Sequence, residues 1–267
     1  LTPILDVFLK LDENNLSKRA SKSYEKDKRF LIPLYTFLIL DFMNYFWCIY
    51  TFTYADFYGV IDRIVFVFTA SQLGNLGMVV GHELLHRKEL VHKVFGTLCY
   101  SKVLYSHFFI EHVKGHHKNV ATPMDPAYAE YGESLYHFVP KSFLGSYKSV
   151  WNYEQNRLNK KKVPEVINIL KNRLVLFNIG HISWISLVTY FLGYKALIFM
   201  ISYGALAVFF LESINYIEHY GLLRSKDENG IYEPVNIKHS WNAPHRYTNY
   251  LLFKLQRHSD HHANAYK

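Results

Sequence analysis

Long apolar runs dominate the chain, and polar or charged segments separate them. About 20 helical residues cross a membrane, and four runs reach this length: Phe30–Tyr54, Tyr58–Val80, Leu174–Leu192 and Ala196–Ile217. Very short connectors, residues 55–57 and 193–195, join the first pair and the second pair, so each pair is expected to form a helical hairpin. The pattern predicts an all-α integral membrane protein, a bundle of at least four transmembrane helices.

The first 29 residues are polar, with a few apolar positions. Leu5, Phe8, Leu9 and Leu16 predict a short amphipathic helix at a membrane surface. A basic block then precedes the first apolar run, and it comprises Lys18, Arg19, Lys22, Lys26, Lys28 and Arg29. Because two hairpins return the chain to its starting side, this block and the lysine run at 160–162 lie on the same side of the membrane, which the positive-inside rule makes cytoplasmic.

Two further segments lie outside the apolar runs. Residues 87–111 are mixed, and we expect a shallow or re-entrant path there, because a full crossing would separate two of the histidine clusters described below. Residues 118–173 are polar and are expected to be loop-like. The whole chain, 1–267, is expected to form a single membrane-embedded domain.

Composition narrows the functional classes. The formal net charge is +8, but the basic residues lie in blocks beside apolar runs and no nucleic-acid motif is present, so nucleic acid is not an expected partner. The two cysteines, Cys48 and Cys99, both lie inside apolar runs. They exclude a four-cysteine iron–sulfur or rubredoxin-type centre within this chain. No cleavable signal peptide is visible.

Three clusters hold many of the 15 histidines. His82 and His86 are four residues apart and share a helix face, as do His112 and His116. His117 lies about 100° round the helix from His116 and can approach a different metal. The third cluster, His258, His261 and His262, is expected to aim three nitrogens at one point. Eight imidazoles exceed what one tetrahedral zinc needs and suit two metals, although imidazole alone does not select the metal.

Carboxylates accompany the clusters. A ligating imidazole usually donates its other N–H to a carboxylate or carbonyl, and the candidates for this role are Glu83, Glu111, Asp125, Glu218 and Asp260. The isolated histidines are interpreted as ordinary surface or core residues: His92, His107, His137, His181 and His239. His245 is less clear, since it lies near the third cluster. The residues 82–86 also satisfy HExxH, which leaves a zinc protease with Glu83 as general base as a rival hypothesis.

Four motifs resemble those of the membrane-bound alkane monooxygenases, the non-haem di-iron terminal hydroxylases. His82–His86 matches His-Glu-x-x-His, Glu111–His117 matches Glu-His-x-x-Gly-His-His, and Leu255–His262 matches Leu-Gln-Arg-His-Ser-x-His-His. The fourth, Asn215–Leu222, matches Asn-Tyr-x-Glu-His-Tyr-Gly-Leu, which fatty-acyl desaturases generally lack. It adds His219 as a ninth ligand. Met124 stands where the family usually has an acid, and by this resemblance the given sequence is expected to be shorter than its relatives at both ends.

The resemblance implies a cytoplasmic-side histidine cap that holds two iron ions on nine histidines, and an apolar channel that leads to them from the bilayer. The implied reaction is O2-dependent terminal hydroxylation of an alkane or fatty-acyl chain to a primary alcohol. The membrane would be the bacterial cytoplasmic membrane, or the endoplasmic reticulum or mitochondrial inner membrane of a eukaryote. A desaturase or sterol-type hydroxylase, and a structural subunit of a larger membrane assembly, are the alternatives.

Each turnover of such an enzyme needs two electrons, and the chain has no flavin or nicotinamide motif. The resemblance therefore implies a separate donor, a rubredoxin- or ferredoxin-like protein with its reductase. Its docking site is expected on the basic face, which includes Lys114, Lys118, Arg224 and Lys254. The alternative is that these residues only hold the topology against anionic lipid.

Overall fold

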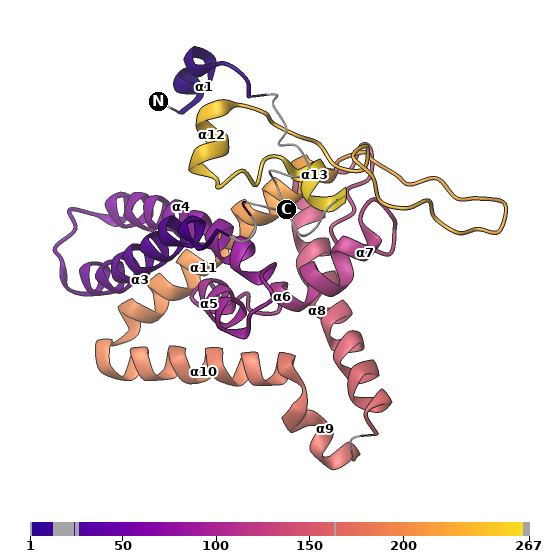
Figure 1. Ribbon diagram of the computed structural model, residues 1–267. Coiled ribbons are helices and arrows are strands. Elements are labelled where there is room, and N and C mark those ends of the chain that lie inside the picture. The colour runs from indigo at the N-terminus through magenta and orange to yellow at the C-terminus, as the bar shows by residue number, and fades with distance from the viewer. Residues whose placement is uncertain (1, 13–23, 25–26, 163, 264–267) are drawn as a thin grey trace.

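A computed structural model describes residues 2–12, 24, 27–162 and 164–263, and this part of the chain is helical with two isolated β-bridges. Its helices, in chain order (Figure 1), are α1 (Thr2–Leu9), the 3₁₀ turn η1 (Lys28–Phe30), α3 (Leu31–Tyr54), α4 (Val60–Leu85), α5 (Leu90–Ser101), α6 (Phe108–Glu111), the π-helical turn η2 (His112–His116), α7 (His117–Asn119), α8 (Leu135–Lys160), α9 (Glu165–Lys171), α10 (Arg173–Leu192), α11 (Tyr194–His219), α12 (Arg246–Leu251) and α13 (His258–Ala263).

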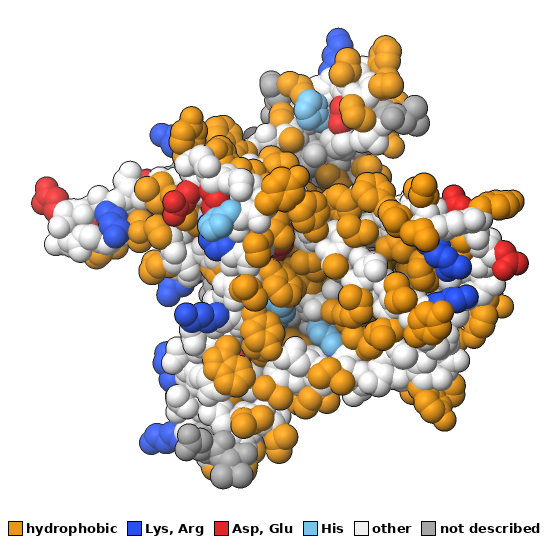
Figure 2. Space-filling model, turned by 180° about the vertical axis from the view of Figure 1, so that it is seen from behind, with side chains coloured by type: hydrophobic (Ala, Val, Ile, Leu, Met, Phe, Trp, Pro, Cys, Tyr) orange, Lys and Arg blue, Asp and Glu red, His pale blue; other side chains and the backbone are white. Residues whose placement is uncertain are grey.

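The predicted transmembrane runs are confirmed as four long apolar helices: α3, α4, α10 and α11. The chain is therefore an integral membrane protein. Gly193 alone connects α10 to α11, with a φ of +82° that favours glycine because a Cβ would strain the backbone there. Figure 2 shows the outer face of the bundle as a broad apolar surface, as expected for side chains that face lipid.

Helix α11 packs against α3, α4, α8 and α10, so it forms the centre of the bundle. Contact with α4 is close because Gly74 lacks a side chain, and the Tyr203 ring of α11 occupies the space that a Cβ there would fill. Tyr203 stacks on Phe199 with ring centroids 5.4 Å apart and contacts Tyr45 of α3 at 5.2 Å. These aromatic contacts fix the register of three transmembrane helices.

Residues 87–111 run back along α4 and then return towards its end, as expected of a re-entrant segment, and their depth in a membrane stays a prediction. Helix α5 has 12 residues, about 18 Å of rise, which is shorter than the roughly 30 Å hydrocarbon core. It packs closely along α4 where Gly81 and Gly96 meet. A side chain would not fit there, because a Cβ on Gly96 would lie 2.8 Å from the Gly81 carbonyl oxygen. Leu104, at φ +61°, then turns the chain towards α6 and η2.

A buried ion pair holds the deep end of this re-entrant segment. The Lys102 ammonium contacts the Asp41 carboxylate of α3, and both side chains are 1% exposed. Gly77 of α4 faces the same pair, and a Cβ there would collide with Asp41 and Lys102. The pair therefore ties α3 and α4 to the segment that follows α5.

The expectation of a loop over 118–173 is wrong for residues 135–160 and 165–171, which form α8 and α9. Hydropathy alone does not predict α8, because polar residues contribute to its buried face. That face repeats every four residues and comprises Phe138, Ser142, Ser146, Val150, Glu154 and Leu158. Glu154 accepts hydrogen bonds from Arg157 and from Arg173 at the start of α10. The guanidinium groups of these two arginines therefore neutralise the buried carboxylate of Glu154.

The predicted N-terminal amphipathic helix is confirmed over Thr2–Leu9 as α1. Val7 and Phe8 are exposed, whereas Asp6 is buried and accepts a hydrogen bond from the Thr248 backbone N–H of α12. Leu16 and the basic residues Lys18, Arg19, Lys22 and Lys26 lie outside the described residues. A membrane-surface position for α1 stays a prediction.

Replacing Lys102 with Met should destabilise the protein by about 3–5 kcal/mol, because it leaves the buried Asp41 carboxylate without its partner. Thermal denaturation in mild detergent measures the effect. The double variant Asp41→Asn with Lys102→Met should recover much of this loss, and Lys88→Met, at an exposed position, should change little. A Lys102→Met protein as stable as the parent would contradict a holding role for the pair.

Candidate metal centre

Four separate segments bring their imidazoles to one buried place: the end of α4, η2 with α7, the end of α11, and α13. All nine predicted histidines are there, and they divide into two groups. The first group is His82, His86, His112, His117 and His261, and the second is His116, His219, His258 and His262. Each histidine offers one ring nitrogen, and within each group these nitrogens lie within 4.8 Å of one another, close enough to hold a metal ion.

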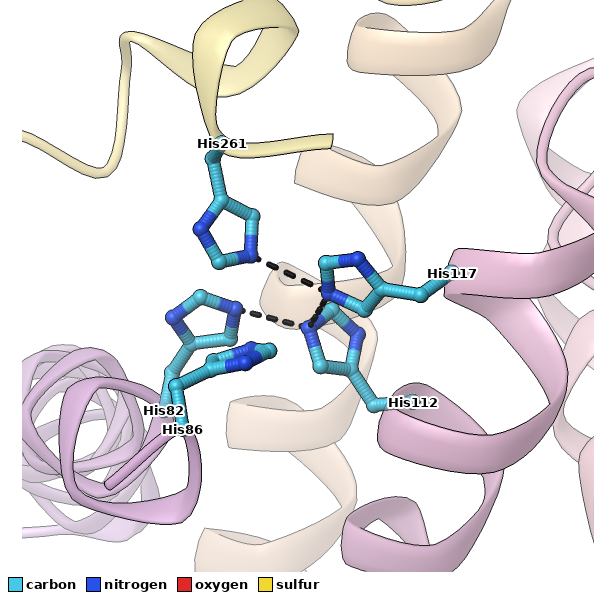
Figure 3. A group of neighbouring side chains, drawn as sticks. All are labelled: His82, His86, His112, His117 and His261. Atoms are coloured by element: carbon cyan, nitrogen blue, oxygen red, sulfur yellow. Dashed lines mark hydrogen bonds between the residues drawn. The ribbon is translucent and has the colours of Figure 1, made fainter. Parts of the chain in front are cut away.

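In the first group the ring nitrogens point at one another (Figure 3). The Nε2 atoms of His82 and His112 are 2.7 Å apart, those of His112 and His117 are 3.0 Å apart, and those of His117 and His261 are 3.1 Å apart. The Nε2 atom of His86 is buried and has no hydrogen-bond partner in the part of the chain that the structure describes.

The second group repeats this arrangement. The Nε2 atom of His262 lies 3.2 Å from that of His116 and 2.9 Å from that of His258, which in turn lies 3.1 Å from His219 Nε2. All four side chains are buried. The ring centroids of His112 and His116 are 5.2 Å apart, so the two groups are immediate neighbours.

The division between the groups corrects two expectations of the sequence. His112 and His116, which would share a face of an α-helix, enter different groups, and His112 is joined by His117 instead. The cause is η2, because a π-helical turn bonds residue i to i+5 and so aligns positions 112 and 117.

In α13 the three histidines do not aim at one point either. His258 and His262, four residues apart, enter the second group, whereas His261 enters the first. Consecutive helical residues point about 100° apart, so neighbouring His261 and His262 address different groups. One short helix thereby contributes to both.

The donor set fits bound metal better than hydrogen bonding among the rings. A ring nitrogen carries at most one proton, yet His112 Nε2 lies within 3.0 Å of two other Nε2 atoms. A metal holds imidazole nitrogens at about 2.1 Å, which separates two ligands at right angles by about 3.0 Å. The spacings of 2.7–3.2 Å match this separation, and the unpartnered Nε2 of His86 would also be satisfied.

The electrostatics also favour metal binding, which requires neutral rings with free lone pairs. Burial, followed by the neighbouring imidazoles, lowers the pKa of His86 to about 2 and holds the pKa values of His112 and His261 well below the ordinary range. Burial likewise lowers the pKa values of His117, His258 and His262. These rings are neutral at neutral pH.

Asp125 takes the position predicted for a supporting acid. Its Oδ2 accepts a hydrogen bond from His116 Nδ1 at 2.8 Å, and its Oδ1 accepts one from the Ala127 N–H at 2.9 Å. Burial alone lowers the pKa of His116, but the Asp125 carboxylate outweighs it and the net shift is upward. Asp125 thus fixes the proton on Nδ1 and leaves the Nε2 lone pair of His116 directed at the second group.

The other predicted acids are placed differently. Glu218 lies 3.3 Å from His258 Nε2, which is the converging nitrogen and not the outward one, so this carboxylate faces the centre itself. Glu83 is 3.9 Å from His82 Nδ1. Glu111 is buried, which raises its pKa to about 7, and its Oε1 has no hydrogen-bond partner among the described residues. Asp260 is half-buried in α13.

Among the basic residues predicted to bind an electron donor, Lys114, Lys118 and Lys254 are exposed. Arg224 is half-buried and donates to the backbone carbonyls of Glu233, Lys118 and Val120. Its guanidinium therefore fastens the segment after α11 to the turn after α7.

Among the described residues, neither histidine group includes the isolated histidines or His245. Sequence reasoning missed Glu212 of α11, which is 1% exposed and accepts a hydrogen bond from Tyr105 at 2.7 Å. The missed signal was an acid inside a transmembrane run, where an ionisable residue is costly and usually functional.

Two small cavities adjoin both histidine groups, each of about 20 Å³. Several residues with polar side chains line the first, among them Tyr105, Glu111, His116, Asp125, Ser142 and Glu212. The second lies between α4 and α11, and its apolar lining includes Met78, Val79, Tyr100, Leu211 and Leu255. Each has room for about one water molecule.

Comparison with known proteins adds to this geometry. A model of the fatty acid desaturase family matches residues 63–266. Alkane 1-monooxygenase 1 of Alcanivorax borkumensis is 36% identical over 99% of this chain and 65% of its own length. Alkane 1-monooxygenase of Pseudomonas putida is 34% identical over 98% of this chain and 64% of its own length. Alkane 1-monooxygenase 2 of Pseudomonas aeruginosa is 36% identical over 99% of this chain and 70% of its own length.

The chain thus spans about two thirds of the length of these relatives. The matched region begins inside α4 and extends beyond α13, so it encloses both histidine groups. On this evidence the chain belongs to the fatty acid desaturase family, in which it is similar to the alkane 1-monooxygenases.

Proposed function

We propose that this chain is the hydroxylase of an O2-dependent monooxygenase, which converts an alkane or fatty-acyl chain to a primary alcohol at a di-iron centre. The observation that carries the proposal is the division of nine converging histidines into groups of five and four. Similarity to proteins named alkane 1-monooxygenases over almost the whole chain supports it. We propose that residues 1–267 act as one domain, because the histidines come from positions spread between 82 and 262.

The nine histidines would be the metal ligands, one iron ion to each group. Imidazole accepts several transition metals, but hydroxylation by O2 requires a redox-active one, and this excludes zinc. When bound, the two irons would supply the activation of O2 and the cleavage of the C–H bond. The rival zinc protease explains two histidines of a group of five and leaves the second group without a role.

The protein's own task is to orient an apolar chain and to exclude water. The second cavity presents apolar side chains of α4 and α11 directly beside His82, His112 and His258. A saturated chain offers no charge or hydrogen bond, so shape and apolar contact must select it. Because this cavity holds only about one water molecule, the side chains that line it, such as Tyr100 and Leu255, must move to admit a substrate.

Electrons would come from a separate rubredoxin- or ferredoxin-like donor with its own reductase. Both cysteines are buried and unpaired, and they cannot form a four-cysteine site. The exposed Lys114, Lys118 and Lys254 would attract an acidic donor to the histidine side of the membrane. The bacterial sources of the relatives favour the bacterial cytoplasmic membrane.

The experiment that tests this function combines metal analysis with product analysis. Protein purified in mild detergent should contain two irons per chain, and with octane, O2 and a surrogate rubredoxin system it should release 1-octanol. An alkene without alcohol would assign the chain to the desaturases instead. A correctly folded native protein that lacks metal would contradict an enzymatic role and favour a structural subunit.

Asp125→Asn should weaken iron retention by about 10–100-fold, since the residue orients His116 and fixes its proton. Competition with a chelator, followed by mass spectrometry of the metal, measures the loss. Glu133→Gln is a matched control, because Glu133 pairs with Lys141 and His137, which belong to neither histidine group. Equal retention in the two variants would remove the supporting role of Asp125.

Replacing Lys114, Lys118 and Lys254 together with Gln should raise the apparent KM for the electron donor several-fold and leave kcat nearly unchanged, because these residues affect encounter more than chemistry. The effect should shrink as ionic strength rises. Lys195→Gln, in the first turn of α11, is the control. An unchanged KM in the triple variant would place donor docking elsewhere.

A further inference from the structure

A line of buried polar side chains leads away from the histidines. None of the side chains in this line is needed to hold a metal. It begins at the first cavity, which touches both groups through His112 and His116. Glu212 and Tyr105 also line this cavity. At about 20 Å³ the cavity can hold one water molecule, which would connect Glu212 to the centre.

Glu212 is the first member of the line. Its Oε1 accepts a hydrogen bond from the Tyr105 hydroxyl at 2.7 Å, and its Oε2 faces Asn215 Nδ2 at 3.4 Å. No lysine, arginine or histidine forms an ion pair with it among the described residues, in contrast to Glu154, which two arginines neutralise. A carboxyl group held by hydrogen bonds alone can accept a proton on one oxygen and release it from the other.

Tyr105 continues the line to α8. Its hydroxyl oxygen lies 3.4 Å from Ser146 Oγ, and Ser146 Oγ lies 3.3 Å from His107 Nε2. At rest the Ser146 hydroxyl donates to the Phe143 carbonyl oxygen at 2.9 Å. Rotation of this hydroxyl towards Tyr105 therefore completes the connection.

The line ends one layer below the protein surface. The His107 ring packs edge-on against Tyr147 at 5.3 Å and Phe143 at 5.9 Å, and these side chains are 37% and 36% exposed. Burial lowers the pKa of His107 to about 4. The ring is therefore neutral at neutral pH, with one nitrogen that donates and one that accepts a proton.

We propose that His107, Ser146, Tyr105 and Glu212 form a proton-delivery path from the surface between α6 and α8 to the cavity at the histidine groups. The proposal rests on the proposed function, which consumes protons. In that reaction a hydrocarbon, O2, two electrons from the donor and two protons yield one alcohol and one water. One oxygen atom enters the C–H bond, and the other leaves as water with the two protons.

The surroundings favour a proton path that is separate from the hydrocarbon. The hydrocarbon would lie against the apolar side chains of the second cavity, such as Met78, Leu211 and Leu255, although His82, Glu218 and His258 also line that cavity. A path through the first cavity, which also reaches both histidine groups, leaves the second cavity to the hydrocarbon. Separate cavities keep bulk water away from the hydrocarbon while protons still enter.

The test compares Tyr105→Phe and Glu212→Gln with Tyr203→Phe, a control that removes an equally buried tyrosine hydroxyl elsewhere in the bundle. Both path variants should keep their metal and slow single-turnover alcohol formation about tenfold or more, with a larger rate decrease in D2O than the parent shows. Tyr203→Phe should stay within twofold of the parent. Path variants that keep their metal and turn over at the parental rate would overturn the proposal.

His107→Ala gives a readout that a structural role would not change. Removal of this ring should slow turnover, and added imidazole should restore much of the rate, because a free imidazole can carry the proton in its place. A slowed variant that imidazole does not rescue would show that His107 supports packing only, and would remove it from the path.

A measurement on the metal-free protein separates this proposal from the proposed function. The infrared difference between the parent and Glu212→Gln isolates the carboxylic C=O band of Glu212, whose shift in D2O reports proton exchange. Exchange should be slower in Tyr105→Phe and Ser146→Ala than in Tyr203→Phe. Equal exchange rates in all variants, or no such band, would overturn the path, whereas absent hydroxylation with slowed exchange would overturn only the function.

Discussion

The structure depends on the gathering of nine imidazoles at one place, seven of them buried and two half-buried, which is stable only if their nitrogens are satisfied. An unpartnered buried polar atom costs about 1–3 kcal/mol, and among the described residues His86 Nε2 is one. Contacts between the rings cannot satisfy all the converging nitrogens, because each nitrogen carries at most one proton. A cation in each group can, so the same arrangement that would destabilise the empty fold provides strong ligation for a metal.

Much of the remaining fold serves to bring these nitrogens together. Helix α5 is too short to cross the bilayer, and it returns η2 to the side where α4 ends. The Lys102–Asp41 pair and the glycine contact between α4 and α5 hold this return in place. At the other end of the chain, α1 packs on α12 through Asp6, and α12 leads directly to α13. Each constraint lies outside the centre but determines the position of a ligand.

The two cavities give the centre two distinct environments. One presents apolar side chains from the transmembrane helices, and the other presents carboxyl and hydroxyl groups from α8, α11 and the segment before α6. The buried polar residues of α8 line the cavity with the carboxyl and hydroxyl groups, which is the first cavity. Ser142 and Ser146, which look like surface residues in the sequence, are buried against Tyr105 and Glu212.

The sequence by itself determined the transmembrane helices and eight of the nine histidines, because apolar length and clustered imidazoles are local patterns that no packing is needed to see. The ninth, His219, was found only through the resemblance of residues 215–222 to a family motif. It could not determine which histidines share a group. That division depends on a π-helical turn at His112–His116 and on the direction of α13, and both are set by packing. The sequence also misassigned α8 and overlooked Glu212, since a polar residue in a helix is buried or exposed only by virtue of its neighbours. Tertiary structure alone decided these features, because they join residues far apart in the chain, such as Tyr105 and Glu212.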